Sequence, residues 1–259
     1  MIPKKCIVDL AVRSNQAIGD RFVLLKCTDE IAPLPLMLPG QFAQLRVDNS
    51  RTTFLRRPIS INYVDTDRNE VWFLIQKVGA GSQALAELKS GDVLNALLPL
   101  GRGFTMPTNT TDSFLLVGGG VGTAPLLYMG SCIKAMGGRP SFLLGARTAS
   151  MLLELDLFGD LGDVYVTTED GSMGEKGFVT QHSILRERRF DMISVCGTSP
   201  MMKAVARFAR ETNTPCEVSL ENMMACGMGA CLCCVEKTVR GNVCVCTEGP
   251  VFDVNELNW

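Results

Sequence analysis

The chain has 259 residues, of which 46% are hydrophobic, enough for about two ordinary domains and a smaller one. Its 25 basic and 27 acidic residues are well mixed and give a net charge of −2, so nucleic acid and anionic membranes are poor candidates as partners. The longest apolar run, 114–130, is broken by five glycines and a proline, which argues against a membrane-spanning helix. The N-terminus lacks the apolar segment of a secretory signal, so we expect a cytoplasmic protein.

Residues 1–105 are predicted to form an antiparallel β-barrel domain. Within 41–47, hydrophobic residues alternate with polar ones such as Gln44, which is the period of a half-buried strand, and the alternation recurs at 71–75. A short helix is expected over 82–88, directly after a glycine-rich turn. Short strands separated by turn signals fit a compact antiparallel barrel.

Residues 106–214 change to strands that alternate with helices. A strand at 114–117 leads into the glycine-rich loop 118–122 and then into an apolar helix that begins at Ala124. Further strands are expected at 141–144, 164–166 and 192–195. This alternation predicts parallel strands joined by crossover helices, so the fold class as a whole is multidomain α+β.

Residues 215–259 are expected to form a small domain that is held together by a metal site. Six of the eleven cysteines lie between Cys226 and Cys246, whereas the other five are scattered through apolar segments and are expected to pack as small hydrophobic residues. Gly241-Asn242 is predicted to be the two-residue turn of a hairpin.

The spacing C-x4-C-x2-C, followed by one more cysteine, is that of plant-type [2Fe-2S] ligation. Three thiolates on one loop would hold the cluster from one side, and the fourth would close the site. Gly227 and Gly229 lie inside the loop, where they allow backbone N–H groups to turn towards the sulfurs. The four predicted ligands are Cys226, Cys231, Cys234 and Cys246.

Two alternatives concern which cysteines bind. Cys233 is treated as a spectator because adjacent cysteines do not readily face one cluster, and Cys244 as another. If Cys244 shared a strand face with Cys246, as the period of two implies, the two would be able to exchange roles. A structural zinc site would leave Cys226 unexplained, since it would use Cys231, Cys234, Cys244 and Cys246.

Three glycine- and arginine-containing motifs point to bound nucleotides. An arginine with a hydroxyl, as in 56–60, can hold a diphosphate, and a glycine turn before a helix, as in 79–82, lets backbone amides approach it. Alone, each is an ordinary surface arginine or turn. The loop 118–122 stands between strand and helix, as a phosphate-binding turn requires. It is not the standard dinucleotide fingerprint, because Arg147 rather than an acidic residue follows the next strand.

The order of these motifs resembles that of the ferredoxin-NADP reductase-like iron-sulfur flavoproteins, and within them the electron-transfer subunits of dihydroorotate dehydrogenase B, along essentially the whole chain. The resemblance implies that FAD contacts Arg57, Pro58, Ile59, Ser60, Leu74, Ile75, Gln76, Gly81 and Ser82. It implies that NAD contacts Gly118, Gly119, Gly120, Gly122 and Thr123, with the loops 168–172 and 196–201. Two residues depart from the family pattern: Cys233, where a small residue such as glycine is expected, and Thr198, where proline is common.

The resemblance also implies the function. We expect an oxidoreductase subunit without catalytic side chains of its own, which passes electrons between an FMN-containing dihydroorotate dehydrogenase and NAD+ through [2Fe-2S] and FAD, in pyrimidine biosynthesis. It further implies a heterotetramer of two catalytic and two electron-transfer subunits. Alternatives are the subunit of a related NAD(P)H-ferredoxin oxidoreductase, sulfide dehydrogenase or hydrogenase, or a zinc-stapled interaction module. The choice between NAD and NADP stays open from the residues, since Arg147 suits a 2′-phosphate and Glu169 and Asp170 suit ribose hydroxyls.

Overall fold

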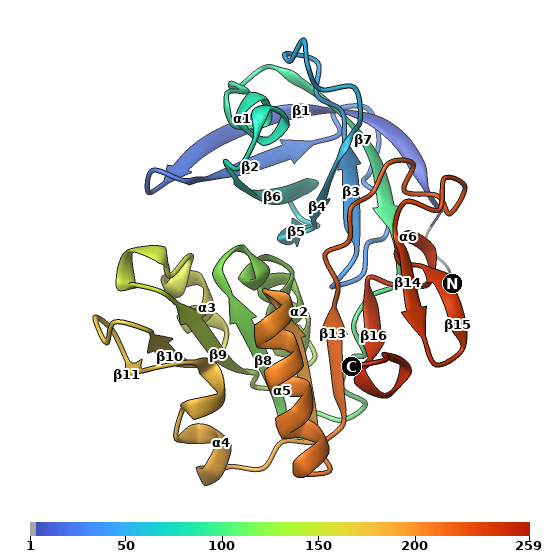
Figure 1. The fold of residues 1–259 in the computed structure, drawn as a ribbon. Helices are drawn as coiled ribbons and strands as arrows, with labels where there is room; N and C mark the ends of the chain where they lie inside the picture. Colours follow the sequence, from blue (N-terminus) through green and yellow to red (C-terminus); the bar gives the residue numbers. More distant parts are fainter. Residues whose placement is uncertain (1–3) are drawn as a thin grey trace. The chain divides into compact units, whose positions relative to one another are not determined.

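The computed structural model describes residues 4–259, whose contacts divide into two compact units (Figure 1). The first unit takes the chain up to Gly103 together with Glu221–Glu236 and Asn242–Pro250. The second takes Phe104–Leu220, Lys237–Gly241 and Val251–Trp259. The cysteine-bearing segments therefore belong with the N-terminal strands, although they follow the second unit in sequence. The division into three domains at 105/106 and 214/215 stays a proposal.

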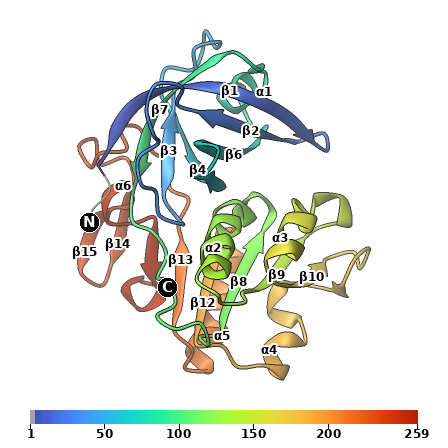
Figure 2. The same ribbon diagram turned by 180° about the vertical axis from the view of Figure 1, so that it is seen from behind.

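The first unit is built on a seven-stranded antiparallel sheet in the order β4-β3-β7-β1-β2-β6-β5, and Figure 2 shows β3 from the back beside β4 and β7. Backbone N–H groups of Ile61 and Asn62 donate to Gln41 O and Trp72 O, both at 3.0 Å, so the two ends of the sheet approach each other and the sheet curves towards a barrel. Its elements are β1 (Cys6–Ile18), β2 (Phe22–Thr28), β3 (Phe42–Leu45), β4 (Arg57–Ser60), β5 (Tyr63–Asp65), β6 (Glu70–Gln76), α1 (Ala80–Ala86) and β7 (Val93–Leu100).

Strand β3 differs from the alternation expected of it. All four of its residues are buried, and Gln44 has 0% of its surface exposed, so the prediction of a half-buried strand is wrong there. The reason is that the side chain of Gln44 lies against Gly227, in a segment of the same unit that is distant in sequence. The predicted helix is present but begins earlier than expected, so Gly81 and Ser82 lie in its first turn.

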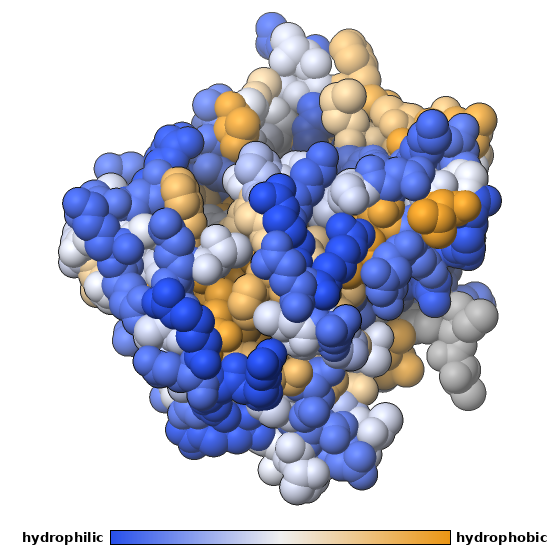
Figure 3. All heavy atoms as spheres, turned by 60° about the horizontal axis from the view of Figure 1, so that its bottom comes forward, coloured by the Kyte–Doolittle hydropathy of each residue, from blue (hydrophilic) through white to orange (hydrophobic). Residues whose placement is uncertain are grey.

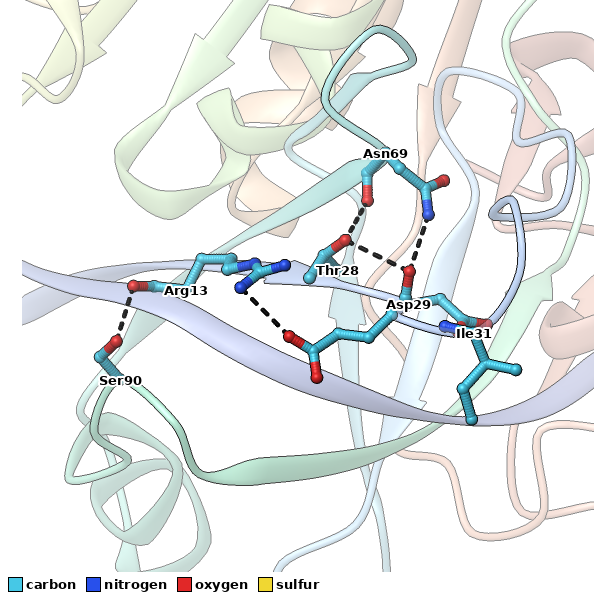
Figure 4. A network of polar contacts seen from close by, with 7 residues as sticks. Arg13, Thr28, Asp29, Ile31, Asn69 and Ser90 are labelled. Atoms are coloured by element: carbon cyan, nitrogen blue, oxygen red, sulfur yellow. Dashed lines mark hydrogen bonds and ion pairs between the residues drawn. The ribbon is translucent and has the colours of Figure 1, made fainter.

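The segment 29–41 between β2 and β3 has no regular structure and is fixed by side-chain hydrogen bonds (Figure 4). Asn69, with a left-handed φ of 54°, donates from Nδ2 to the carbonyl oxygens of Asp29 and Ala32 at 2.8 and 3.0 Å. The Thr28 hydroxyl donates to Asn69 O at 2.7 Å. Gln41 ends the segment: its Oε1 accepts from Leu38 N and its Nε2 donates to Gly101 O, both at 2.8 Å. These bonds satisfy the buried polar groups of a loop that offers no strand pairing.

The second unit contains a seven-stranded sheet in the order β11-β10-β9-β8-β12-β13-β16, parallel except for β16. The predicted alternation of strands and helices is confirmed. Helix α2 packs on α3, and α5 packs on β12 and β13. The elements are β8 (Phe114–Gly119), η1 (Gly120–Thr123), α2 (Ala124–Ala135), β9 (Ser141–Ala146), η2 (Ala149–Met151), α3 (Leu155–Leu161), β10 (Asp163–Thr168), β11 (Glu175–Lys176), η3 (Val179–Gln181), α4 (Ile184–Glu187), β12 (Met192–Cys196), α5 (Ser199–Glu211), β13 (Cys216–Ser219), β16 (Val251–Asp253) and η4 (Val254–Glu256).

The core of this unit depends on a close approach between α2 and the sheet. Phe142 and Phe158 pack edge to face with ring centroids 4.9 Å apart, and neither side chain has any exposed surface. Gly130 of α2 lies directly on the Phe142 ring, where a Cβ would collide with it. Glycine is tolerated inside this helix because the aromatic pair occupies the space that a side chain would need.

The C-terminal hairpin consists of β14 (Val235–Thr238) and β15 (Gly241–Cys244), followed by the single turn α6 (Val245–Glu248). The predicted Gly241-Asn242 turn is wrong, because the chain turns at Val239 and Arg240 and Gly241 already belongs to β15. The Thr238 hydroxyl fixes this turn by accepting from Arg240 N and donating to Gly241 O, and Gly241 has a φ of +107°.

Hydrophilic residues predominate on the face drawn in Figure 3, and hydrophobic residues show between them in several separate groups. Among residues 4–259, no helix combines the length and the apolar character that a membrane crossing needs.

Glu217 is a buried carboxylate in the second unit. It lies on β13 with 5% of its surface exposed, and both of its oxygens accept from Thr105 N at 3.1 Å. Ser194 Oγ on β12 donates to Oε1 at 2.8 Å. Burial raises the pKa of Glu217, and these hydrogen bonds offset only part of that effect.

We predict that Glu217→Gln stabilises the protein more at neutral than at acidic pH. A carboxyl whose pKa is raised in the folded state contributes its stability fully below the unfolded value, about 4.3, and loses it as the pH rises through the folded value. The glutamine keeps the acceptor for Thr105 N and does not titrate. The melting temperature of the variant minus that of the wild type should therefore rise between about pH 4 and pH 7.

The matched control is Glu211→Gln, which removes an exposed carboxyl from the end of α5. The melting temperature of Glu211→Gln minus that of the wild type should not rise between about pH 4 and pH 7. A Glu217→Gln difference that stays constant across the pH series would contradict the assignment.

Candidate functional site

The two predicted FAD motifs meet in the first unit. Strand β4 pairs with β3, with Arg57 opposite Leu45 and Ser60 opposite Phe42, and its residues are half-buried. A Cβ placed on Gly81 would lie 2.5 Å from Arg57 Nε, so the guanidinium group passes directly over the first turn of α1. Only glycine allows this arrangement, and it places a cation at the first turn of α1, where a charged side chain and backbone N–H groups together suit a diphosphate.

The neighbouring arginine has a different task. Arg56 Nη1 donates to Gln44 O and Asn95 O, both at 3.1 Å, and its Nη2 donates to Asn95 Oδ1. Asn95 in turn donates to Asp9 Oδ1, which links β7 to β1. Arg56 therefore fixes the chain just before β4, and Arg57 is the arginine left to meet a ligand.

The remaining predicted FAD residues divide into two groups. Leu74 and Ile75 have 2% and 0% of their surface exposed, so only their backbone would be able to contact FAD. Gln76 is half-buried. The Ser82 hydroxyl accepts from Val78 N and Gly79 N at 2.9 and 3.1 Å. It shapes the turn before α1, and Gly81 leaves room for the Arg57 guanidinium beside that turn.

The predicted nucleotide loops lie together in the second unit. Strands β8 and β12 are neighbours, and the chain proceeds from β8 to one side through β9 and β10 before β12 returns on the other. This is a topological switch point, where open α/β sheets bind ligands beyond the carboxyl ends of the strands. The segment 118–123, predicted as a loop, comprises the last two residues of β8 and the turn η1 there, and the segment 196–201 runs from the end of β12 into the first turn of α5.

These two segments come into contact because glycines, which have no side chain, lie where they meet. A Cβ on Gly122 would lie 2.6 Å from both Cys196 O and Gly197 Cα, and a Cβ on Gly119 would collide with Met201. Thr123 is buried, and its hydroxyl donates to Gly120 O at 3.0 Å. The loops thus expose backbone at the switch point, which suits a dinucleotide. At the ends of β9 and β10, the backbone N–H of Asp170 donates to the carbonyl oxygen of Arg147 at 3.2 Å.

The predicted cluster ligands come together in the first unit. Cys226 and Cys231 lie on one loop, since Cys226 Sγ accepts from Met228 N and Cys231 N, both at 3.4 Å. Cys246 Sγ accepts from Gly229 N at 3.1 Å, and Cys234 Sγ accepts from Cys246 N at 3.4 Å. The expectation that a loop glycine turns its N–H towards a sulfur is confirmed for Gly229, whose φ is +80°.

The thiols of Cys226 and Cys246 differ in their pKa values. Hydrogen bonds from Met228 N and Cys231 N lower the pKa of Cys226 to about 6, because they stabilise the thiolate. Burial, with the neighbouring Cys234 thiol, raises the pKa of Cys246 to about 12. A bound metal would displace both protons, and the Cys226 thiol would lose its proton more readily.

The predicted fourth ligand, Cys246, lies on a helical turn and not on a strand. Strand β15 ends at Cys244 and α6 contains Cys246, so the argument that both share one strand face is wrong. Cys246 is fully buried, whereas Cys244 is half-buried and its Sγ donates to Gly229 O at 3.8 Å. Cys233 is exposed. These positions support Cys246 over Cys244, which stays a proposal.

The donor set fits the number of thiolates that a [2Fe-2S] cluster takes, two on each iron. Among residues 4–259, no three Cys, His, Asp or Glu side chains surround a single position suited to one metal ion. The cysteines instead occupy two neighbouring elements, the loop 226–234 and α6, with backbone N–H groups directed at the sulfurs.

Sequence reasoning missed Gln44. It lies fully buried beside Gly227 of the cluster loop, and both polar atoms of its side chain lack a hydrogen-bond partner within the described residues. The alternating pattern of β3 assigned it to the solvent side, and a single sequence holds no signal that would have corrected this.

Comparison with known proteins agrees with these sites. The model of the iron-sulfur cluster binding domain of dihydroorotate dehydrogenase B matches residues 221–258. Among solved structures, that of an NADH-dependent reduced ferredoxin-NADP oxidoreductase, studied for flavin-based electron bifurcation, matches with a TM-score of 0.85 and 29% identity, over 96% of this chain and 90% of that one.

Curated relatives match nearly the whole length. The dihydroorotate dehydrogenase B (NAD(+)) electron transfer subunit of Shouchella clausii is 39% identical over 224 residues, which is 85% of this chain and 86% of the relative. The subunit of the same name from Geobacillus kaustophilus is 34% identical over 252 residues, 96% of this chain and 97% of that one. The chain therefore belongs to the family of electron-transfer subunits of dihydroorotate dehydrogenase B.

Proposed function

We propose that this chain carries electrons between a partner dihydroorotate dehydrogenase and NAD+, using a [2Fe-2S] cluster and FAD, in pyrimidine biosynthesis. The observation that carries the proposal is the match to curated electron-transfer subunits along nearly the full length of both chains. The grouping of the four cysteines and of Arg57 with Gly81 supports it independently.

The carriers supply the redox chemistry: bound FAD exchanges a hydride with nicotinamide and passes electrons one at a time to an iron-sulfur cluster. The residues of this chain bind and orient them. Arg57 and Ser60 of β4, with the turn at Gly81 and Ser82, would hold the diphosphate of FAD. Cys226, Cys231, Cys234 and Cys246 would hold the cluster, and the loops after β8 and β12 would hold NAD.

The partner would hold the site for dihydroorotate and its FMN. A flavin-bearing barrel needs about 200 residues or more, and the two units leave no such length in these 259 residues. We further propose that the assembly is a heterotetramer of two catalytic and two electron-transfer subunits, and that it works in the cytoplasm.

A second function is favoured by one observation, the likeness to the NADH-dependent reduced ferredoxin-NADP oxidoreductase at a TM-score of 0.85. In that case the partner would serve a ferredoxin-linked reaction instead of dihydroorotate oxidation. The identity to curated dihydroorotate dehydrogenase B subunits, 34–39%, is higher than the 29% to that structure. We therefore rank dihydroorotate oxidation ahead of the ferredoxin-linked reaction. Identification of the partner chain distinguishes the two functions.

The first prediction concerns the cluster ligands. Replacing Cys226, Cys231, Cys234 or Cys246 by alanine should abolish or cripple cluster assembly, because each removes one of four thiolates. Iron, acid-labile sulfide and the visible spectrum of anaerobically purified protein measure this. Cys233→Ala and Cys244→Ala are the controls and should retain the cluster. Loss in Cys244→Ala with retention in Cys246→Ala would reverse the assignment, and zinc in place of iron would overturn it.

The second prediction concerns FAD. A charge-assisted hydrogen bond from arginine contributes about 1.5 to 3 kcal/mol, so Arg57→Ala should weaken FAD binding roughly ten- to a hundredfold. Equilibrium dialysis or fluorescence titration of the flavin-depleted protein measures the affinity. Arg13→Ala is a suitable control, since Arg13 pairs with Glu30 on the exposed surface of the same unit. Equal affinities in Arg57→Ala and the wild type would refute this role.

The third prediction tests the function itself. Co-expressed with an FMN-containing dihydroorotate dehydrogenase chain from the same genome, this chain should co-purify and confer NAD+-dependent oxidation of dihydroorotate to orotate. Alone, it should only oxidise NADH with artificial acceptors. If the chains do not associate, or the complex reduces FMN but never NAD+, the ferredoxin-linked function becomes the better account.

A further inference from the structure

Gln44 is a buried amide without a partner. Its side chain has no exposed surface, and neither Oε1 nor Nε2 has a hydrogen-bond partner within residues 4–259. Folded proteins pair almost all buried polar groups, and an exception calls for a specific explanation, such as a ligand.

A second glutamine three positions earlier shows that the chain pairs such groups where it can. Gln41 is also buried, with 3% of its surface exposed, yet its Oε1 accepts from Leu38 N and its Nε2 donates to Gly101 O. The two residues have the same side chain and lie in the same unit. The first unit as a whole thus supplies partners for a buried glutamine side chain. The lack of a partner for Gln44 must arise from its immediate surroundings.

That position is the cluster loop. A Cβ built on Gly227 would lie 2.9 Å from Gln44 Cγ and 3.4 Å from its Nε2. Gly227 directly follows Cys226, and its φ of +71° turns the loop at this point. Leu100 lies at the same spot, with Cδ1 2.9 Å from the built Cβ, and adds an apolar wall beside the amide. The amide thus lies at the Cys226 side of the loop, in surroundings that give a water molecule few other polar partners.

The backbone of the same residue belongs to the proposed FAD site. Gln44 pairs with Pro58 of β4, and its carbonyl oxygen accepts from Arg56. One residue of β3 therefore connects the strand that bears the FAD motif with the loop that bears the cysteines.

We propose that the Gln44 side chain donates a hydrogen bond from Nε2 to a sulfur of the [2Fe-2S] cluster, on the side ligated by Cys226. This inference rests on the proposed cluster ligation. An N–H donor stabilises the more negative, reduced state of a cluster, and hydrogen bonds to the sulfurs are among the factors that set its potential. Gln44 is a positioning residue that makes the cluster easier to reduce, in addition to the backbone donors of Met228, Gly229 and Cys231.

The test compares Gln44→Met with Gln41→Met in the full-length protein with FAD and cluster bound. Methionine has a similar length and no N–H donor. A redox titration followed by electron paramagnetic resonance should give a lower midpoint potential for the cluster in Gln44→Met, and an unchanged one in Gln41→Met. An unchanged cluster potential in Gln44→Met, or a shift of the FAD potential alone, would overturn the proposal.

A second measurement does not depend on any variant folding. In wild-type protein labelled with 15N in the side-chain amides of glutamine, pulsed electron paramagnetic resonance of the reduced cluster should detect a coupled 15N nucleus. The coupling should persist in Gln41→Met and vanish in Gln44→Met. A cluster without this coupling in the wild type would show that the amide bonds something else, such as a trapped water. Absence of any [2Fe-2S] signal would instead count against the proposed function.

Discussion

The placement of the cysteine loop depends on one close approach. Gly227 lies against Gln44 and Leu100 of the antiparallel sheet, and a Cβ there would come within 2.9 Å of both side chains. Its φ of +71° is a second reason why only glycine fits. This contact helps to join a segment that follows the second unit in sequence to the first, as does the hydrogen bond from Arg102 N to Gly249 O. It holds the loop of Cys226 and Cys231 against β3, the strand that pairs with β4.

The general plan of the fold was predictable because it follows from short-range patterns. Alternating strands and helices identified the parallel sheet of the second unit, and the strands and the helix start at Ala124 lie where the apolar runs placed them. The cysteine spacing identified a set of thiols that the fold does bring together. Both signals are local, because the pattern that predicts a strand, a helix or a cysteine loop lies within about ten residues.

One local side-chain interaction and several tertiary contacts explain what the sequence did not reveal. The turn at Val239 and Arg240 is fixed by the Thr238 hydroxyl, a bond that outweighed the Gly-Asn signal. Gln44 is buried because a distant glycine loop covers the face that its strand pattern assigned to solvent. The FAD motifs were each ambiguous in isolation, since an arginine and a glycine turn are common. Only their contact, Arg57 over Gly81, distinguishes them from ordinary surface residues.

The two units offer different groups to their proposed ligands, and this difference fits the roles of the ligands in electron transfer. At the ends of β8 and β12 in the second unit, glycines let the segments 118–123 and 196–201 approach each other, so the proposed NAD site offers backbone groups. The first unit would use a charged side chain over a helix turn for FAD, and four thiols for the cluster, of which those of Cys234 and Cys246 are buried. Groups of this kind are costly to leave unpaired, which favours carriers that stay bound. The contacts accordingly gather the FAD motif and the cysteines into one unit despite their separation in sequence. Electron transfer requires that the permanent carriers keep a fixed distance from each other. Gln44, whose backbone pairs with β4 and whose side chain touches the cysteine loop, links the two segments that carry them in our proposal.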